Sequence, residues 1–369
     1  GLASVNATHQ ALQDAADAAA LDAARQLGVA NGAGLSARTS ANVAAQLSGQ
    51  SNFTYTVTTT TGTSPPSVTV TINANRTSFF GNLLPPGGWN MTSSSTAVQM
   101  STVPLCVLQT GTVATTQINM AGTTRITAPG CLVHGNSGVQ VSGSSQLNAG
   151  LVQSSALASG PITPTPQSGA PVITDPFASM NLSPAIPACL PVPQVLAYTT
   201  QTLLPGVHCG NLTVSTGATL NLLPGEHYFK TGSLALQQNA VLTGDDVVLF
   251  FDDDADFQFT QTSDIRLRGR RTGQFAGFVL ATTRQNNHTF NISSTSAHEL
   301  LGTVYVPNAT LAISGTQNIA DQSAWTVIVA RNIRTQGSAT LVVNSNYSGS
   351  TVPVPMGVGP NGSAVRLAH

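Results

Sequence analysis

Charged side chains are scarce in this chain. Asp, Glu, Lys and Arg make up 7% of its 369 residues, whereas an ordinary soluble domain has about 25%. Lys230 is the only lysine, and the formal net charge is −1. Because the sequence has no basic stripe, it lacks the electrostatic footprint that nucleic acids and anionic membranes attract. We therefore expect no nucleic-acid partner.

Long apolar runs and catalytic motifs are also missing. The sequence has no run of about 18 apolar residues, the length that a membrane-spanning helix requires. Its histidines form no HxH or HExxH ligand set, and no P-loop, GxSxG or GxGxxG motif follows a predicted strand. We therefore expect a non-enzymatic protein without cofactors.

Four cysteines are present, and their spacing excludes the usual metal and redox motifs. Cys106, Cys131, Cys189 and Cys209 match neither CxxC zinc clusters nor thioredoxin-like pairs. An even number of cysteines in a chain rich in Thr and Asn favours two disulfides and an oxidising compartment. Of the three possible connectivities we favour the sequential one, Cys106 with Cys131 and Cys189 with Cys209.

The first part of the chain, residues 1–103, predicts a small α+β domain with a long N-terminal Ala-rich helix. Apolar residues recur at helical spacing over residues 2–28, and Gly28 is a typical helix end. We expect this face to be an assembly seam, because small side chains allow helices to approach closely. The seam residues are Val5, Leu12, Ala16, Ala19, Ala23 and Leu27.

The rest of this domain changes to a period of two. After a second, short helix at residues 41–47, "FTYTVTTTTG" and "SVTVTINAN" predict a β-hairpin. "TSFFGNLL" predicts a helical turn that packs Phe79, Phe80 and Leu83, and "MTSSSTAVQM" predicts a third strand. We expect the helix to pack on this sheet.

Beyond residue 103 the sequence repeats a three-strand pattern. "INM", "RIT" and "CLV" are followed about 20 residues later by "VQV", "QLN" and "LVQ", and the pattern resumes after residue 205. Such repeats predict a right-handed parallel β-helix, a solenoid with three short strands per coil. The expected segments are first coils at 104–155, a Pro/Ser-rich excursion at 156–205, the main solenoid at 206–347 and an irregular tail at 348–369.

The solenoid also predicts where the two disulfides lie. Residues one coil apart lie on neighbouring strands, about 4.8 Å apart, which a disulfide can bridge. We expect Cys106 and Cys131 to join two coils at the end of the stack, and Cys189 and Cys209 to fasten the excursion.

Several motifs resemble TadE/TadG-like proteins of the bacterial tight-adherence (Flp) pilus system. They include "LQDAADAAALDAAR", "PGCLVHGNS", "DPFASM", "LPGVHCGNLTV" and "GTVYVPNATLAISG". The resemblance implies a cell-surface role in pilus assembly, anchoring or capping, with pilin-like subunits as partners of the helix. It also implies a membrane anchor before Gly1, and it transfers no catalytic residue.

One acidic cluster is a weak candidate for Ca²⁺. Asp252, Asp253, Asp254 and Asp256 supply the oxygen ligands that Ca²⁺ prefers, but EF-hand and RTX spacings are absent. We favour a solvated turn whose charge is offset by Arg266, Arg268, Arg270 and Arg271.

Three functions therefore remain open. We favour an extracellular structural protein of a surface appendage, which assembles through its helix and displays the solenoid for adhesion or capping. A polysaccharide-binding or polysaccharide-cleaving β-helix protein is an alternative, in which Asp264 with Arg266 and Arg268, or the carboxylates of Asp252 to Asp256, would supply the acid–base chemistry. An ice- or carbohydrate-binding module is the third, because flat Thr-rich faces bind ordered surfaces.

Overall fold

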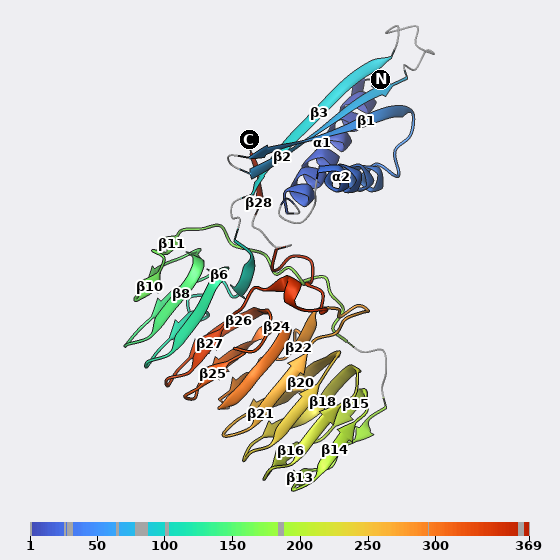
Figure 1. Ribbon diagram of the computed structural model, residues 1–369. Helices are drawn as coiled ribbons and strands as arrows, with labels where there is room; N and C mark the ends of the chain where they lie inside the picture. The colour runs from blue at the N-terminus through green and yellow to red at the C-terminus, as the bar shows by residue number, and fades with distance from the viewer. Residues whose placement is uncertain are drawn as a thin grey trace. The chain divides into compact units, whose positions relative to one another are not determined.

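The computed structural model describes residues 2–25, 27, 32–63, 66–77, 88–99, 103–183, 188–293, 295–360 and 365–368. The protein is mainly β, and it divides into two compact units (Figure 1). The first unit contains Gly1–Thr102 and Pro360–His369, and the second contains Val103–Gly359. The last ten residues of the chain thus belong with its beginning.

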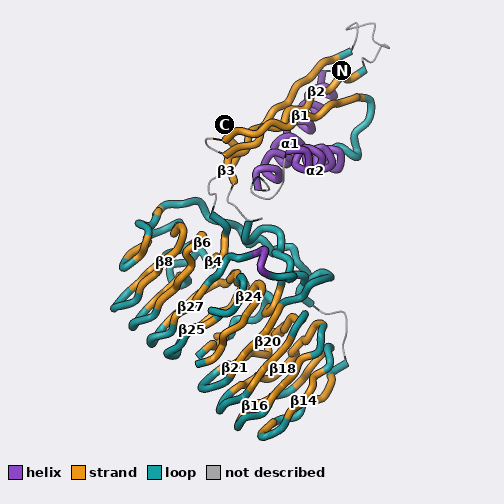
Figure 2. The backbone as a smooth tube through the Cα atoms, in the orientation of Figure 1, coloured by secondary structure: helices purple, strands orange, loops and turns teal. Residues whose placement is uncertain are grey.

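The first unit packs two helices on one side of an antiparallel sheet with the strand order β1-β2-β3-β28 (Figure 2). In chain order its elements are α1 (Leu2–Arg25), α2 (Gly32–Gln46), β1 (Phe53–Thr63), β2 (Pro66–Arg76), β3 (Trp89–Gln99) and β28 (Val365–Ala368). Alternate residues of β2, including Val68, Val70 and Ile72, are fully buried against the alanines of α1. The small alanine side chains allow the helix to lie close to the sheet, so the predicted helix-on-sheet packing is confirmed.

Two expectations for this unit differ from the structure. The second helix begins at Gly32, well before the predicted range 41–47. The tail predicted as irregular ends in β28, which pairs with β3 through Leu367 and Ala97. A four-residue strand carries too little alternation to be recognised from sequence. Gly28 and the turn with Phe79, Phe80 and Leu83 lie outside the described residues.

The second unit is a parallel β-solenoid of about ten turns, as predicted. A first block contains β4 (Leu105–Gln109), β5 (Ile118–Met120), β6 (Arg125–Gly135), β7 (Val139–Val141), β8 (Gln146–Ser154), β9 (Ala158–Ser159), β10 (Ile162–Thr163) and β11 (Gln167–Ser168).

A second block contains β12 (Leu190–Pro191), β13 (Val195–Ala197), β14 (Thr200–Leu203), β15 (Gly206–Cys209), β16 (Leu212–Ser215), β17 (Thr219–Leu222), β18 (Gly225–Leu236), β19 (Val241–Gly244), β20 (Val247–Phe259), β21 (Asp264–Arg268), β22 (Phe278–Thr282), β23 (Thr289–Ile292), β24 (Ser296–Ile313), β25 (Asn318–Ile319), β26 (Thr326–Thr335) and β27 (Thr340–Val342). A short 3₁₀ helix, Tyr347–Gly349, follows.

Inward-facing apolar residues of successive coils stack above one another and form the solenoid core. One such row aligns Leu234, Phe257, Phe290, Leu311, Ile333, Ile118 and Val139. All seven side chains are buried. Each contributes about 1.5–3 kcal/mol through burial, and only the next coil provides that burial. The repeat therefore folds as a stack.

The coils do not stack in chain order. The last coil of the second block lies on the first coil of the first block, because β26 pairs in parallel with β4 and β5, and β27 pairs with β6. The stack therefore begins at β12–β14, passes through β26 and β27, continues with β4 and ends at β9–β11. Figure 1 shows these two ends at opposite extremes of the solenoid.

The excursion is shorter than the predicted range 156–205. Strands β9–β11 and β12–β14 belong to the solenoid. The part of the excursion outside the solenoid strands includes residues 170–183, which follow β11. We call these residues the strap. The chain must return from one end of the stack to the other, and the strap makes part of that return along the outer side of the solenoid.

The strap is bound to the solenoid by aromatic contacts and hydrogen bonds. The Phe177 ring lies 4.8 Å from that of Phe278 and 5.1 Å from that of Tyr305. Tyr305 Oη donates to Asp175 Oδ2 at 2.7 Å. Arg284 donates to the carbonyl oxygens of Phe177 and Met180 at 2.6 and 2.8 Å. The strap therefore covers an apolar surface that would otherwise face water.

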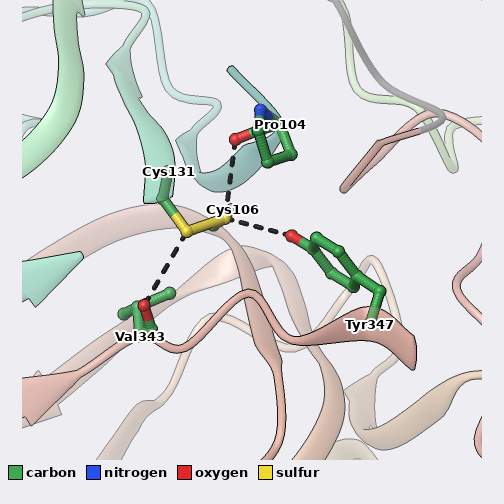
Figure 3. Close-up of a disulfide and its surroundings, with 5 residues drawn as sticks. All are labelled: Pro104, Cys106, Cys131, Val343 and Tyr347. Atoms are coloured by element: carbon green, nitrogen blue, oxygen red, sulfur yellow. Dashed lines mark hydrogen bonds between the residues drawn. A yellow bond between two sulfur atoms is a disulfide. The ribbon is translucent and has the colours of Figure 1, made fainter. Parts of the chain in front are cut away.

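Both predicted disulfides are present. Cys106–Cys131 joins β4 to β6, and Cys189–Cys209 joins the residue before β12 to the end of β15. The first does not lie at the very end of the stack as expected, because the second block stacks on β4 and because β8 and β11 follow β6. Tyr347 Oη donates to Cys106 Sγ at 3.2 Å (Figure 3).

Candidate binding surface

The outer face of the sheet in the first unit carries a regular array of hydroxyl and amide side chains. In β1, β2 and β3 the residues that alternate with the buried ones all point to this face. The strand register places Gly62–Ser67–Val98 at one end and aligns the others in four rows, Thr54–Asn75–Asn90, Thr56–Asn73–Thr92, Thr58–Thr71–Ser94 and Thr60–Thr69–Thr96. We call these twelve residues the Thr/Asn lattice. None of them is charged or apolar.

Hydrogen bonds between neighbouring strands order the lattice. They join Thr69 to Thr96 at 2.7 Å, Thr71 to Ser94 at 3.0 Å, Thr92 to Asn73 at 2.8 Å and Asn75 to Asn90 at 2.7 Å. Neighbouring strands are about 4.8 Å apart, and residues on one face of a strand repeat about every 6.8 Å. The lattice is therefore an uncharged grid of donors and acceptors whose spacing is fixed by the strands.

An open depression of about 380 Å³ lies at one end of the lattice. Its lining includes the amides of Asn73, Asn75 and Asn90 and the hydroxyls of Thr54 and Thr92. Amides supply a donor and an acceptor on one group. This end can therefore hydrogen-bond a ligand whose hydroxyl groups act in both senses.

The face of α1 predicted as an assembly seam packs within the first unit. Leu12, Ala16, Ala19 and Ala23 are at most 2% exposed and lie in the core formed with the sheet. Val5 and Leu27 are partly buried against the same core. An alanine face fits a sheet as well as it fits another helix, and this chain supplies the sheet itself.

The acidic cluster does not form a metal site among the described residues. Asp252, Asp253, Asp254 and Asp256 lie within β20, and no group of three or more potential ligand side chains is found in the described part of the chain. The pKa of Asp253 is raised because its carboxyl hydrogen-bonds that of Asp252 and is close to its charge.

The four arginines expected to offset this cluster pair with other carboxylates. The ion pairs are Arg266–Asp264, Arg268–Glu299, Arg270–Asp246 and Arg271–Asp245, at 3.1, 2.8, 2.8 and 2.6 Å. Asp264 and the arginines near it, the candidates for acid–base chemistry, are thus partners in surface ion pairs.

A pair of histidines inside the solenoid is inaccessible. His208 and His227 are fully buried, and His208 Nε2 lies 3.2 Å from His227 Nδ1. Burial and the neighbouring His227 lower the pKa of His208 to about 4, and burial lowers the pKa of His227. Both side chains are therefore neutral at pH 7 and pack as core residues.

The lattice is the feature that the sequence only partly revealed. The Thr alternation of β1 is visible in "TYTVTTTTG", and it indicates a hairpin strand. The matching alternation of β2 and β3 becomes a surface only when their register is known.

The two disulfides indicate an oxidising compartment. Among the described residues, no helix is both long and apolar enough to cross a membrane. No protein-family model, curated protein or solved structure matches the chain. The resemblance to TadE/TadG-like proteins therefore stays a prediction, and the function has to be inferred from the surfaces described above.

Proposed function

We propose that the protein is a non-enzymatic, extracellular adhesion protein that binds a neutral polysaccharide surface through the Thr/Asn lattice. The observation that carries this proposal is the lattice, twelve uncharged polar residues in register on one open sheet face. The position of such a protein at a pilus follows from the sequence resemblance alone, and it is part of the proposal.

The chemistry of the lattice favours a neutral, hydroxyl-rich ligand. A charged polymer would find no counter-charge among the twelve side chains. A folded protein partner would find no apolar anchor among the twelve side chains, and such anchors dominate protein–protein binding. A polysaccharide surface presents hydroxyl groups in a repeating pattern, and this grid can meet many of them at once. Many weak contacts then add to a useful affinity.

The solenoid supports this role mechanically. Its coils are joined by continuous parallel ladders and two disulfides, so it resists unfolding and proteolysis outside the cell. A rigid stack of this kind is a suitable scaffold for an adhesive unit. The helix α1 stabilises that unit from behind the sheet.

Sedimentation with insoluble polysaccharides tests the proposal. The purified chain is mixed with cellulose, chitin or insoluble α-glucan, and with pectate as a charged control. We expect binding to at least one neutral polymer and none to pectate. The double variant Asn73→Ala/Thr92→Ala, which removes polar groups from the depression, should weaken binding at least tenfold.

Gln140→Ala is the matched control, because Gln140 is an exposed amide residue on β7 of the other unit. It should bind like the parent chain. Failure to bind any neutral polymer overturns the proposal. If the protein binds no polysaccharide but shows thermal hysteresis in a freezing assay, the ligand of the lattice is ice.

A further inference from the structure

One end of the solenoid is open. The terminal coil, formed by β12, β13 and β14, pairs on one side with β15, β16 and β17. On its other side no strand of the described residues pairs with it. Parallel strands with a single neighbour leave half of their backbone N–H and C=O groups directed to solvent or to another chain.

The terminal coil also exposes large apolar side chains. Val195, Tyr198 and Leu204 are 64%, 84% and 60% exposed. Leu190 and Leu223, at 40% each, lie on this coil and on the next. Four of these five side chains thus belong to the terminal coil itself, where apolar surface is available for a contact.

This end carries no charge. Residues 188–225 contain no Asp, Glu, Lys or Arg. Proteins usually protect sheet edges with charged side chains, above all Lys, and that protection is absent here. Two copies of this coil can face each other without bringing like charges together.

The opposite end of the stack is closed by its own chain. Strands β9, β10 and β11 have two residues each, and Pro161, Pro164 and Pro166 flank the last two. Ser168 Oγ accepts from Ala158 N, and Gly169 N donates to Ala156 O. Short strands and prolines prevent further pairing, whereas at the other end only β12 (Leu190–Pro191) has these features and β13 and β14 are longer and without proline. Head-to-tail stacking is therefore disfavoured.

The chain already contains one junction between coils that are not consecutive. Residues 328–330 of β26 pair with residues 107–109 of β4 across the two blocks. Separate coils of this solenoid therefore bind edge to edge when their apolar rows match. A second copy would extend the same stacked sheets at the open end.

We infer that two copies of the chain associate end to end through their terminal coils. Because only one end is open, the contact joins like ends and is two-fold symmetric. Facing strands then run antiparallel, and the dimer closes without forming a filament. The exposed apolar side chains of the two coils are buried against each other. This inference does not depend on the proposed polysaccharide binding.

Light scattering after size-exclusion chromatography of the full chain tests it. The expected particle has twice the chain mass of 37.7 kDa. Val195→Lys and, separately, Tyr198→Lys should raise the dissociation constant at least tenfold, because each places two charges in the contact. Both residues are exposed in the single chain, so the circular dichroism spectrum of each variant should match that of the parent chain.

Leu157→Lys is the matched control, since Leu157 is 70% exposed near the closed end. It should remain dimeric. A parent chain that is monomeric at every concentration overturns the inference. So does a dimer that survives both terminal-coil variants, or a growing series of oligomers that Leu157→Lys interrupts, because that series would require head-to-tail contacts.

Discussion

Two outer sheet faces of this protein differ in exposure: one is buried and the other is open to solvent. On the solenoid, outward residues of β20, β22 and β24 such as Phe250, Phe278 and Tyr305 are apolar or aromatic, and they are buried in a cluster with the strap. On the first unit, the Thr/Asn lattice lies open. The apolar face of the solenoid, whose exposure to water would cost free energy, is covered by the strap. The polar face of the first unit is exposed to solvent. An open polar face with a regular register is thus the better candidate for binding, and the covered face is a matter of stability.

The largest effect should come from uncovering the solenoid face. Phe177→Ala removes the aromatic ring that anchors the strap against Phe278 and Tyr305. We expect the free energy of unfolding of the solenoid to fall by about 4 kcal/mol, measured by urea denaturation. Val172→Ala is the control, because Val172 is an exposed strap residue and should change it by less than about 0.5 kcal/mol. Equal effects of the two variants would show that the strap is not anchored at Phe177.

Removal of a disulfide should have the next largest effect, and it should separate the two units. Cys106→Ala/Cys131→Ala opens a cross-link between residues 25 apart, which costs about 3 kcal/mol through the entropy of the unfolded chain. The first unit contains no cysteine, so its unfolding should not respond. Hydrogen exchange resolved by peptide measures both units in one experiment. Faster exchange in β1–β3 of the variant would contradict this independence.

Acid should weaken the solenoid through its buried histidines. An unfolded histidine titrates near pH 6.5, whereas the folded pKa of His208 is about 4. The folded state therefore binds fewer protons, and stability that is complete above pH 6.5 is lost as the pH falls toward 4. For His208 the loss amounts to about 2 kcal/mol between pH 7 and pH 5.

His208→Gln removes the titrating group and tests this effect. The variant loses some stability at pH 7, but its denaturation midpoint should vary less between pH 7 and pH 5 than that of the parent chain. An unchanged pH dependence would assign the acid sensitivity to other groups.

The sequence predicted those features that depend on local pattern. The three-strand repeat predicted the solenoid, and coil spacing together with sequential order predicted both disulfides. The order of the two blocks was not predictable, because every coil presents a similar apolar row and any coil fits another. The alanine face of α1 was ambiguous for a related reason, since small side chains at positions such as Ala16 and Ala19 suit a sheet or a second helix. Which partner covers a face is decided by the whole chain.

The smallest effect on stability, and the clearest distinction between the two faces, should come from the centre of the lattice. Thr71→Val keeps the shape of the side chain and removes the hydroxyl that bonds Ser94. Thr71 points to the open face, so the free energy of unfolding should change by less than about 0.5 kcal/mol, while polysaccharide binding should weaken several-fold. If the variant instead unfolds more easily by 1 kcal/mol or more and binds normally, the lattice stabilises the sheet and the binding surface lies elsewhere. The same substitution thus tests whether an open polar face serves function or folding.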